Sequence, residues 1–341
     1  MKIFTTQSGI ALINELVAII GLLITVLVLV IKATAEIIKM KSQLFPNSGK
    51  SLNDKVTHLQ IEVSKIHTTI SSIEQQLGKP KRKTRWRIKR YVVISDLQFP
   101  FIKKQYVDSL LDYIDYVKPQ ALLCVGDELD AQTISTYARG TSLEFEGSLQ
   151  KNIIGLKGLL KEFRSALGRS KPFIMQRSNH TARIERYISK FAPAFSVIDA
   201  IKIENLLGYN YKDLSITYNR TLKEFTNGWI LAHGDENRLF SEAGKTALNL
   251  AIKTGKNVIC SHTHRQGVMS SSVGYAGNQR TLTGVEVGHL CDIKKMSYLR
   301  ENIANWQAGF AVVYEQDGRV KPELVPFNKD GSFIAEGELW K

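Results

Sequence analysis

The sequence predicts a layered α/β domain over residues 91–341, and three observations support this fold class. Short apolar runs of strand length alternate with longer segments of helical periodicity, which is typical of α/β folds. The helical periodicity is clear at residues 107–117, 149–167 and 242–253. Several apolar runs end directly in a polar residue, as strands buried in a parallel sheet do. Residues 1–90 differ in character and are predicted to form an N-terminal appendage.

A long apolar segment lies near the start of the chain. Residues 10–31 read IALINELVAIIGLLITVLVLVI, which reaches the roughly 20 residues needed to span a bilayer. We therefore predict an N-terminal transmembrane anchor within residues 1–35. A signal peptide and a buried core helix are the alternatives.

Flanking charges and cysteines predict where the C-terminal part of the chain lies. Three lysines, Lys32, Lys39 and Lys41, follow the apolar segment, whereas Lys2 and the α-amine precede it. By the positive-inside bias, this asymmetry predicts a single-pass membrane protein whose C-terminal domain is cytoplasmic. The 3 cysteines agree with a reducing compartment, because their number is odd and two of them fall in predicted core strands.

Residues 36–78 are predicted to form a helical or coiled-coil stalk. Apolar residues recur there at alternating intervals of three and four, which is the heptad spacing of a coiled coil. They are Val56, Leu59, Val63, Ile66, Ile70, Ile73 and Leu77. Such a stalk would make the protein a homo-oligomer, either a dimer or a trimer. The alternative is an amphipathic helix that packs on its own domain.

A basic linker over residues 79–90 follows, because Gly78 and Pro80 end the helix. It reads KPKRKTRWRIKR and contains no acidic residue. Residues 1–90 hold 15 of the 46 Lys and Arg but 5 of the 32 Asp and Glu, so the formal net charge of +14 is concentrated here. The run is suited to bind phosphates of nucleic acid or anionic lipid, and the alternative is a solvated tether.

Two aspartates follow the first two apolar runs of the α/β domain. Asp96 comes after the run 91–94, and Asp127 comes after the run 121–125. Parallel strands deliver such groups to one edge of a sheet, so we expect the two carboxylates to lie side by side. Two carboxylates in an apolar setting repel each other unless a cation lies between them, which predicts a metal site.

Three further apolar runs, PFIM, WILA and NVIC, are also followed by polar residues with metal-binding side chains. These residues are Asn179, His180, His233, His262 and His264. Together with the aspartates they offer the nitrogen and oxygen ligands that divalent transition ions prefer. A polar cluster of Glu286, His289 and Asp292 either lines the same site or has a structural role.

The C-terminal part is predicted to be β-rich after Thr283. Residues 309–325 read GFAVVYEQDGRVKPELV, which predicts a hairpin that turns at Asp317-Gly318.

The order of these polar residues resembles that of the calcineurin-like metallophosphoesterases. The pattern of that family is D-x-H, GD-x-x-D, GNH-[DE], H and GH-x-H. Here it reads Asp96-Leu97-Gln98, Gly126-Asp127-Glu128-Leu129-Asp130, Ser178-Asn179-His180-Thr181, His233 and Ser261-His262-Thr263-His264. The longer stretches NHTARIERY, HTHRQG and NWQAGF are most similar to the phage and prophage branch.

The resemblance implies a four-layer α/β/β/α sandwich over residues 91–341 that binds two divalent ions: manganese, iron or zinc. One ion would take Asp96, Gln98 and His264, and the other would take Asn179, His233 and His262, with Asp127 bridging both. His180 would serve as general acid toward the leaving group, and Asp130 would orient it. Arg183 is a weaker candidate for contact with the substrate phosphate.

The predicted activity is two-metal hydrolysis of a phosphoester, with a nucleic-acid or nucleotide phosphodiester favoured and DNA as a possible partner. Phosphomonoesters, including phosphoproteins, are the alternative substrates. Two departures from the family pattern bear on activity: Gln98 stands where His is usual, and Thr181 stands where an acid is usual. A non-catalytic, membrane-tethered protein that binds DNA or a partner is therefore a further alternative, as is a structural protein that acts through its stalk.

Overall fold

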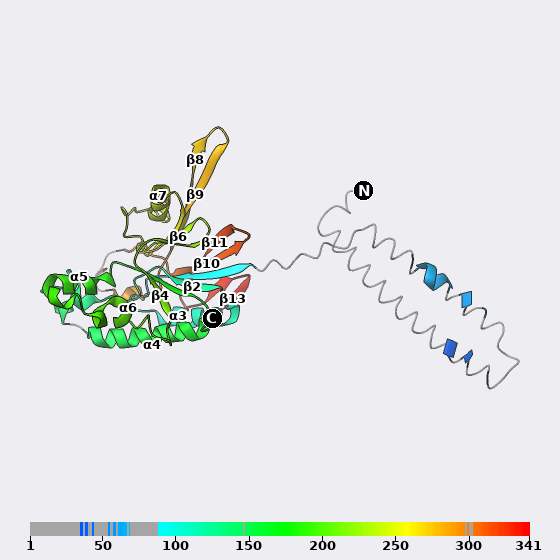
Figure 1. Ribbon diagram of the computed structural model, residues 1–341, viewed down its shortest axis with the longest axis horizontal. Coiled ribbons are helices and arrows are strands. Elements are labelled where there is room, and N and C mark those ends of the chain that lie inside the picture. Colours follow the sequence, from blue (N-terminus) through cyan, green and yellow to red (C-terminus); the bar gives the residue numbers. More distant parts are fainter. Residues whose placement is uncertain are drawn as a thin grey trace. The chain divides into compact units, whose positions relative to one another are not determined.

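The chain divides into two compact units, Met1–Trp86 and Arg87–Lys341. A computed structural model of the chain is shown in Figure 1. It describes residues 35–36, 38–39, 43, 54, 57–58, 61–66, 68, 88–145, 147–296, 299 and 303–341.

The described residues of the first unit are helical. Among them, Ile38 is buried against Ala35 and Val63. Val63 and Ile66 are the two predicted heptad positions that the structure describes. The other heptad positions and residues 79–87 of the predicted linker lie outside the described residues. The coiled-coil stalk therefore stays a prediction.

The predicted single-pass membrane localisation is corrected here. Among the residues that the structure describes, no helix combines the length and the apolar character needed to cross a bilayer. The predicted span at residues 10–31 lies outside the described residues.

The larger sheet of the second unit has six strands in the order β11-β10-β1-β2-β3-β4. Its parallel part is β1 (Lys89–Ile94), β2 (Ala121–Cys124), β3 (Phe173–Gln176) and β4 (Ile216–Asn219). Its antiparallel part is β10 (Gly309–Gln316) and β11 (Arg319–Pro326). The helices after β1, β2 and β3 are α3 (Lys104–Val117), α4 (Leu149–Leu167) and α5 (Ala182–Phe191).

The second sheet has five strands in the order β5-β6-β7-β9-β8. They are β5 (Lys223–Thr226), β6 (Trp229–Leu231), β7 (Asn257–Cys260), β8 (Gln266–Tyr275) and β9 (Asn278–Val287). Helix α7 (Lys245–Thr254) connects β6 to its parallel neighbour β7. The remaining elements are α6 (Ile203–Leu206), the pair β12 (Phe333–Ala335) and β13 (Glu338–Trp340), and the short 3₁₀ turns η1 (Gln132–Ile134), η2 (Ser142–Glu144), η3 (Pro193–Phe195), η4 (Asp199–Ile201) and η5 (Ile293–Lys295).

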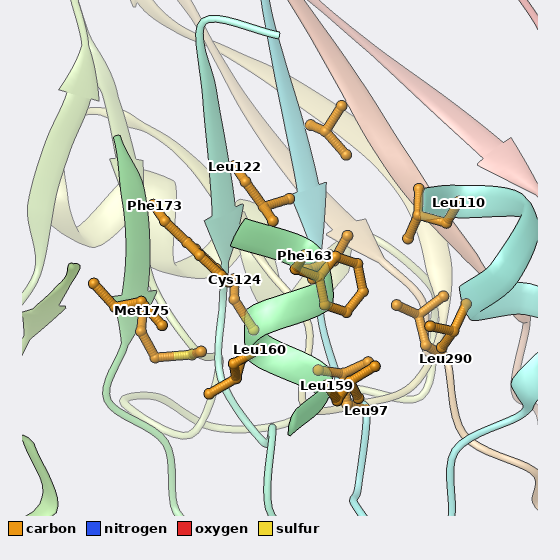
Figure 2. Close-up of a cluster of buried hydrophobic side chains, with 14 of the residues drawn as sticks. Leu97, Leu110, Leu122, Cys124, Leu159, Leu160, Phe163, Phe173, Met175 and Leu290 are labelled. Atoms are coloured by element: carbon orange, nitrogen blue, oxygen red, sulfur yellow. The ribbon is translucent and has the colours of Figure 1, made fainter. Parts of the chain in front are cut away.

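Three apolar clusters hold these elements together as layers. Alternate residues of a strand face opposite sides of a sheet: Val92 and Ile94 of β1 pack with α3 and α4, whereas Val93 packs with the second sheet. Figure 2 shows part of the first cluster, in which side chains of α3 and α4 meet those of β2 and β3. Its labelled members are Leu97, Leu110, Leu122, Cys124, Leu159, Leu160, Phe163, Phe173, Met175 and Leu290. The third cluster joins the far face of the second sheet to α7.

The predicted mixed α/β organisation is confirmed. Helix α4 has the bounds expected from its periodicity. Helix α3 begins three residues before its expected start, and α7 begins three residues after its expected start. The predicted C-terminal hairpin is β10–β11, and it turns at Asp317 and Gly318, whose φ angles of 51° and 76° both lie in the left-handed region. Such a pair of angles is that of the type I′ turns that favour tight hairpins.

The long hairpin of β8 and β9, which extends away from the rest of its sheet, has no clear local signal in the sequence (Figure 1). Its exposed face carries hydroxyl side chains in place of the apolar alternation that identifies most strands. Ser270 and Ser272 form cross-strand hydrogen bonds of 2.9 and 3.1 Å with Thr283 and Thr281. Strand pairing, which is not visible in a local hydrophobic pattern, thus builds this element.

Strand β1 begins two residues before the predicted Tyr91. Lys89 Nζ lies 2.9 Å from a carboxylate oxygen of Glu315 on β10, and Arg90 Nε lies 2.6 Å from one of Glu336. The last two basic residues of the predicted linker are therefore strand residues with acidic partners.

Replacing Gly284 by Ala tests the packing of α7 on the second sheet. A Cβ atom at Gly284 would lie 2.0 Å from the backbone nitrogen of Leu248 in α7, which is closer than packed atoms can approach. We expect Gly284→Ala to lower the free energy of unfolding by about 1–3 kcal/mol in urea denaturation. Gly158→Ala on α4 is the matched control, because nothing lies within 4 Å of its new methyl group. The control should be neutral or stabilise by up to about 1 kcal/mol; equal behaviour of the two variants would contradict the packing.

Candidate metal centre

The predicted ligands come together where the carboxyl ends of strands from both sheets meet. β1, β2 and β3 contribute from the larger sheet, whereas β6 and β7 contribute from the second sheet. The side chains that converge are Asp96, Gln98, Asp127, Asn179, His180, His233, His262 and His264. Most of them are buried, and Asn179 and His262 are partly exposed.

The backbone turns sharply after these strands. Asp96, Asp127, His262 and His264 have φ angles of 48°, 54°, 65° and 59°, in the left-handed region that few non-glycine residues adopt. Aspartate and histidine tolerate this region better than most residues. Each turn redirects the chain at the end of its strand, and the side chains therefore reach a common centre.

Gly126 allows two of the strand ends to approach each other closely. Its φ is 106°, and a Cβ atom there would lie 2.5 Å from Cβ of Ser178 and 2.8 Å from Nδ1 of His233. A side chain at this position would push apart the loops that carry Asp127 and Asn179.

One group of predicted ligands surrounds Asp96. Its Oδ1 lies 3.0 Å from Nε2 of His264, and its Oδ2 accepts a hydrogen bond of 2.7 Å from the Ser95 hydroxyl. Gln98 donates from Nε2 to Oδ2 of Asp127 at 3.1 Å. Its buried Oε1 has no hydrogen-bond partner among the described residues, so this oxygen is available to a ligand.

The second group surrounds Nε2 of His233. This nitrogen lies 2.8 Å from Oδ1 of Asn179, 3.1 Å from Nδ1 of His262 and 3.4 Å from Oδ2 of Asp127. Nδ1 of His233 lies 2.8 Å from the carbonyl oxygen of Val125, which places the proton of a neutral ring on Nδ1. In this neutral form the lone pair of Nε2 faces two acceptor oxygens, of Asn179 and Asp127, and Nδ1 of His262, whose role depends on its tautomer. Either a proton on Nε2 or a cation at this point resolves the contacts with the two oxygens, and a cation would make these atoms its ligands.

Without such a cation, a proton on His233 balances part of the carboxylate charge. Burial alone would raise the pKa of Asp127, but the neighbouring His180 and His233 lower it well below its ordinary value. The pKa of Asp96 is likewise lowered, because the effect of His264 outweighs that of burial. Burial would lower the pKa of His233, yet Asp127 raises it to about 10. The buried carboxylates thus require positive charge beside them.

The donor set fits two divalent ions. Three ligand atoms of Asp127, His233 and His262 lie within 4.8 Å of one another, and so do three of Asp96, Asp127 and His264. Asp127 belongs to both groups, which matches its expected bridging position. The amide oxygens of Gln98 and Asn179 complete a nitrogen and oxygen set that suits divalent transition ions.

The predicted general acid, His180, lies beside the shared carboxylate. Its Nδ1 is 3.4 Å from Oδ2 of Asp130, and its Nε2 is 2.9 Å from NH2 of Arg183 and 3.8 Å from Oδ2 of Asp127. The backbone N–H of His180 donates to Oδ1 of Asp127 at 3.1 Å. Arg183 also donates from NH1 to the carbonyl oxygen of Asp130 at 2.7 Å. The structure thus brings Asp130 and Arg183 to His180, and the predicted roles of Asp130 in orienting that ring and of Arg183 in phosphate contact stay predictions.

The buried carboxylate of Glu128, which was not predicted as a site residue, supports the loop of His180. Oε1 of Glu128 accepts hydrogen bonds of 2.7 Å from the Thr181 hydroxyl and 2.6 Å from the Tyr209 hydroxyl. Burial raises the pKa of this carboxyl group. Thr181 occupies the position where the family pattern has an acid, and it is hydrogen-bonded to an acid from the neighbouring strand end. The signal in the sequence is the adjacency of Glu128 to Asp127 and of Thr181 to His180.

The centre opens into a cavity of about 460 Å³. It is lined by Asp127, Asp130, Gln132, Ser135, Tyr137, Ala138, Leu143, Asn179, His180, Arg183, His262, His264 and Trp306. The ring centroid of Trp306 lies 3.9 Å from that of His264, so this indole covers one side of the centre. A cavity of this size admits a substituent as large as a nucleotide.

The polar cluster near residue 290 does not enter the metal groups. Glu286 accepts hydrogen bonds from the backbone N–H of Thr246 at 2.9 Å and from the Thr263 hydroxyl at 2.5 Å, so it holds α7 and the His262 loop together. His289 is buried, and burial lowers its pKa to about 3. Asp292 caps the short turn η5 through the backbone N–H of Lys294. Glu286 and Asp292 thus have structural roles.

Two phage proteins are similar to this chain over most of its length. The chain is 34% identical over 260 residues to the Gene 54 protein of Mycobacterium phage L5, which covers 74% of this chain and 99% of the phage protein. It is 34% identical over 257 residues to the Gene 54 protein of Mycobacterium phage D29, with the same coverage. No protein-family model matches the chain. The relatives are phage proteins, in keeping with the predicted resemblance to a phage branch.

Solved structures with some similarity include three Vacuolar Protein Sorting 29 (Vps29) proteins. The protein from Cryptosporidium parvum is 12% identical, with coverage of 74% of this chain and 94% of that chain and a TM-score of 0.37. Chaetomium thermophilum Vps29 is 14% identical, with coverage of 71% of this chain and 92% of that chain and a TM-score of 0.37. Vps29 complexed with Zn²⁺ from Entamoeba histolytica is 13% identical, with coverage of 70% of this chain and 99% of that chain and a TM-score of 0.31. All three TM-scores lie below 0.5, so these similarities establish neither fold nor function.

Asp127→Asn tests whether one carboxylate serves two metal ions. We expect the full chain, stripped with chelator and dialysed against Mn²⁺ or Zn²⁺, to retain two ions per molecule by elemental analysis. Asp127→Asn should lose both, because the shared ligand is removed, whereas His264→Ala should lose one. Asp112→Asn, an exposed aspartate on α3, is the matched control and should retain both. Full retention in Asp127→Asn would exclude the shared site.

Gln98→His tests the weak ligand of the first group. A neutral amide oxygen binds transition ions more weakly than an imidazole nitrogen does. The substitution should therefore raise the affinity of the weaker site for Zn²⁺ on the order of tenfold in competition with a chelating dye. Gln120→His places a histidine at an exposed position outside the centre and should leave both affinities unchanged. A similar gain in the control would show that any added histidine has this effect.

Proposed function

The chain belongs to the family of the mycobacteriophage Gene 54 proteins, and we propose that it is a two-metal phosphoesterase acting on a nucleic-acid or nucleotide phosphodiester. The observation that carries this proposal is the pair of ligand groups that share Asp127 beside His180 and its partner Asp130. A structural metal site would have no need of a histidine and an arginine at its open side. In this proposal the layers of the second unit are those of a metallophosphoesterase sandwich.

Asp96, Gln98 and His264 would hold one ion, and Asn179, His233 and His262 the other, with Asp127 between them. Two divalent ions, as manganese, iron or zinc, supply Lewis-acid activation of the phosphoryl group and of the attacking water. The close approach of Asn179 Oδ1 and His262 Nδ1 to Nε2 of His233, at 2.8 and 3.1 Å, supports this assignment, because three ligand atoms already face one point.

His180 would donate a proton to the leaving-group oxygen. Its Nδ1 faces Asp130 at 3.4 Å, so the carboxylate can hold the ring orientation and stabilise its protonated form. Its Nε2 is on the side of Arg183, and both residues line the cavity. On substrate binding, Arg183 would exchange its contact with Nε2 for a phosphate oxygen, which would free that nitrogen to meet the leaving group.

The charge of the chain favours a polyanionic diester over a small monoester. The formal net charge is +14, and Arg183 brings one cation into the cavity itself. Such an excess attracts polyphosphate backbones by long-range attraction. The basic run at residues 79–90 supplies much of this excess.

Removal of the His180 side chain tests the proposed role. With the full chain loaded with Mn²⁺, we expect His180→Ala to lower kcat on bis(p-nitrophenyl) phosphate by about 10²–10⁴-fold, because a general acid contributes that much. Its metal content should stay as in the parent protein, since His180 is not a ligand. His58→Ala, an exposed histidine of the first unit, is the matched control and should keep full activity.

The same assay separates the candidate functions. Turnover of the diester in preference to p-nitrophenyl phosphate supports a nuclease-like substrate, and the reverse preference supports a phosphatase. Two bound ions with no turnover of either ester would favour the non-catalytic binding protein. A chain that binds no divalent ion would refute the proposed centre altogether.

A further inference from the structure

A second groove lies beside the metal centre, along α5. It has a volume of about 370 Å³. It is lined by Ile134, Thr136, Tyr137, Asn179, Arg183, Arg186, Tyr187, Lys190 and Phe191, and we call it the α5 groove. Tyr137, Asn179 and Arg183 also line the cavity of the metal centre, so the two hollows are continuous.

The α5 groove is basic along its length. Arg183, Arg186 and Lys190 follow one another at helical spacing and therefore share one side of α5. None of the described residues that line the groove is acidic. Glu185 of α5 lines a separate cavity and lies 3.0 Å from Arg220. The groove thus presents cations without a carboxylate among its lining residues.

Exposed aromatic rings lie between these cations. Tyr137 is 87% exposed, and Tyr187 and Phe191 are 43% and 46% exposed. The rings of Tyr187 and Phe191 lie 4.8 Å apart at their centroids, and the guanidinium of Arg139 lies 5.0 Å from the centroid of Phe191. Exposed rings interleaved with cations are the usual means by which proteins bind single-stranded nucleic acid, since every base can stack on them.

We propose that the α5 groove binds a single strand of nucleic acid and leads its backbone into the metal centre. Arg183, Arg186 and Lys190 would contact successive phosphates, while Tyr187 and Phe191 would stack against unpaired bases. This inference rests on the proposed function and names its substrate: the single-stranded polynucleotide on either side of the cleaved diester.

Two features favour this occupant over a duplex or a phosphopeptide. Arg183 and Lys190 are seven residues apart, which is about 10 Å along a helix, so one phosphate cannot contact all three cations. A duplex presents its phosphates but keeps its bases stacked inside, and the exposed rings of Tyr187 and Phe191 would then have nothing to bind. A strand with unpaired bases uses both the cations and the rings.

Binding is measured first, with the full chain in EDTA so that no hydrolysis occurs. The probe is fluorescein-labelled oligo(dT), and its anisotropy is followed at several salt concentrations. We expect Tyr187→Leu, which keeps an apolar side chain but loses the ring, to weaken binding at least about fivefold, and Tyr187→Phe to bind as the parent does. Lys190→Gln should reduce the slope of log K against log salt by about 0.7, the value for one phosphate contact. Lys171→Gln, before β3 at the other end of the sheet, is the matched control and should change neither quantity.

Controls assign the effect to the α5 groove. The basic run at residues 79–90 is present in every variant, so its contribution cancels in these ratios. A duplex of the same length should be insensitive to Tyr187→Leu. Equal binding by Tyr187→Leu and Tyr187→Phe would overturn the inference, as would a phosphopeptide that displaces the oligonucleotide at equal charge.

Activity then separates this inference from the proposed function. With Mn²⁺, Tyr187→Leu should lower kcat/KM on oligo(dT) at least about fivefold and leave kcat/KM on bis(p-nitrophenyl) phosphate unchanged, because the small ester does not reach the groove. Equal losses on both esters, or on neither, would overturn the groove as a strand site while the metal centre remained active. If the parent protein turns over neither ester, the proposed function fails, and the binding ratios in EDTA still decide whether the groove holds a strand.

Discussion

The arrangement of the centre depends on two buried carboxylates, Asp96 and Asp127, which require positive charge beside them. Both are fully desolvated at the junction of the two sheets, where an uncompensated charge is costly. The carboxylate of Asp127 stabilises a proton on His233, which is why the pKa of His233 is raised although the ring is buried. Nδ1 of that ring faces the carbonyl oxygen of Val125, so the proton that balances the charge of Asp127 lies on Nε2, the atom that faces the carboxylate. A divalent cation bound at Nε2 would replace that proton and leave the hydrogen bond to Val125 intact.

The position of these carboxylates depends in turn on how the two sheets pack. β1, β2 and β3 bring Asp96, Asp127 and Asn179 to one edge, and β6 and β7 bring the histidines to the facing edge. The apolar cluster between the sheets, which includes Val93 and Leu123 on one side and Leu231 and Ile259 on the other, holds the edges together. A change in this inter-sheet core would therefore move one set of ligands against the other. Gly126 already lies so close to Ser178 and His233 that the strand ends have no room to move toward each other.

Many of the strands and ligands were predictable from local sequence patterns, whereas the remaining features depend on which strands pair with each other. Apolar runs and the polar residues that end them predicted β1, β2, β3, β6 and β7 and the candidate ligands other than Gln98, which only the family resemblance indicated. The division of these strands between two sheets has no local signal, because a buried strand reads the same in either sheet. The β8–β9 hairpin was not predicted for a related reason. Its Ser and Thr side chains form hydrogen bonds across the two strands, and a local apolar pattern does not reveal that pairing. The hydrogen bond from Thr181 to Glu128 could not be predicted either, because the two residues are far apart in the sequence and meet only where their strand ends lie side by side.

The two departures from the metallophosphoesterase pattern have different physical consequences. Glutamine and histidine are both neutral ligands, so Gln98 changes the strength of one ligand bond while leaving the charge that faces a bound phosphate unaltered. With two divalent ions bound, the two carboxylates would leave a net positive charge, which would complement the anionic diester of the proposed function. Thr181 stands where the pattern has an acid, but its hydroxyl donates a hydrogen bond to Glu128, so the loop of His180 keeps a carboxylate contact. In the proposed function the site would thus keep its attraction for a phosphodiester, and the departures would lower metal affinity.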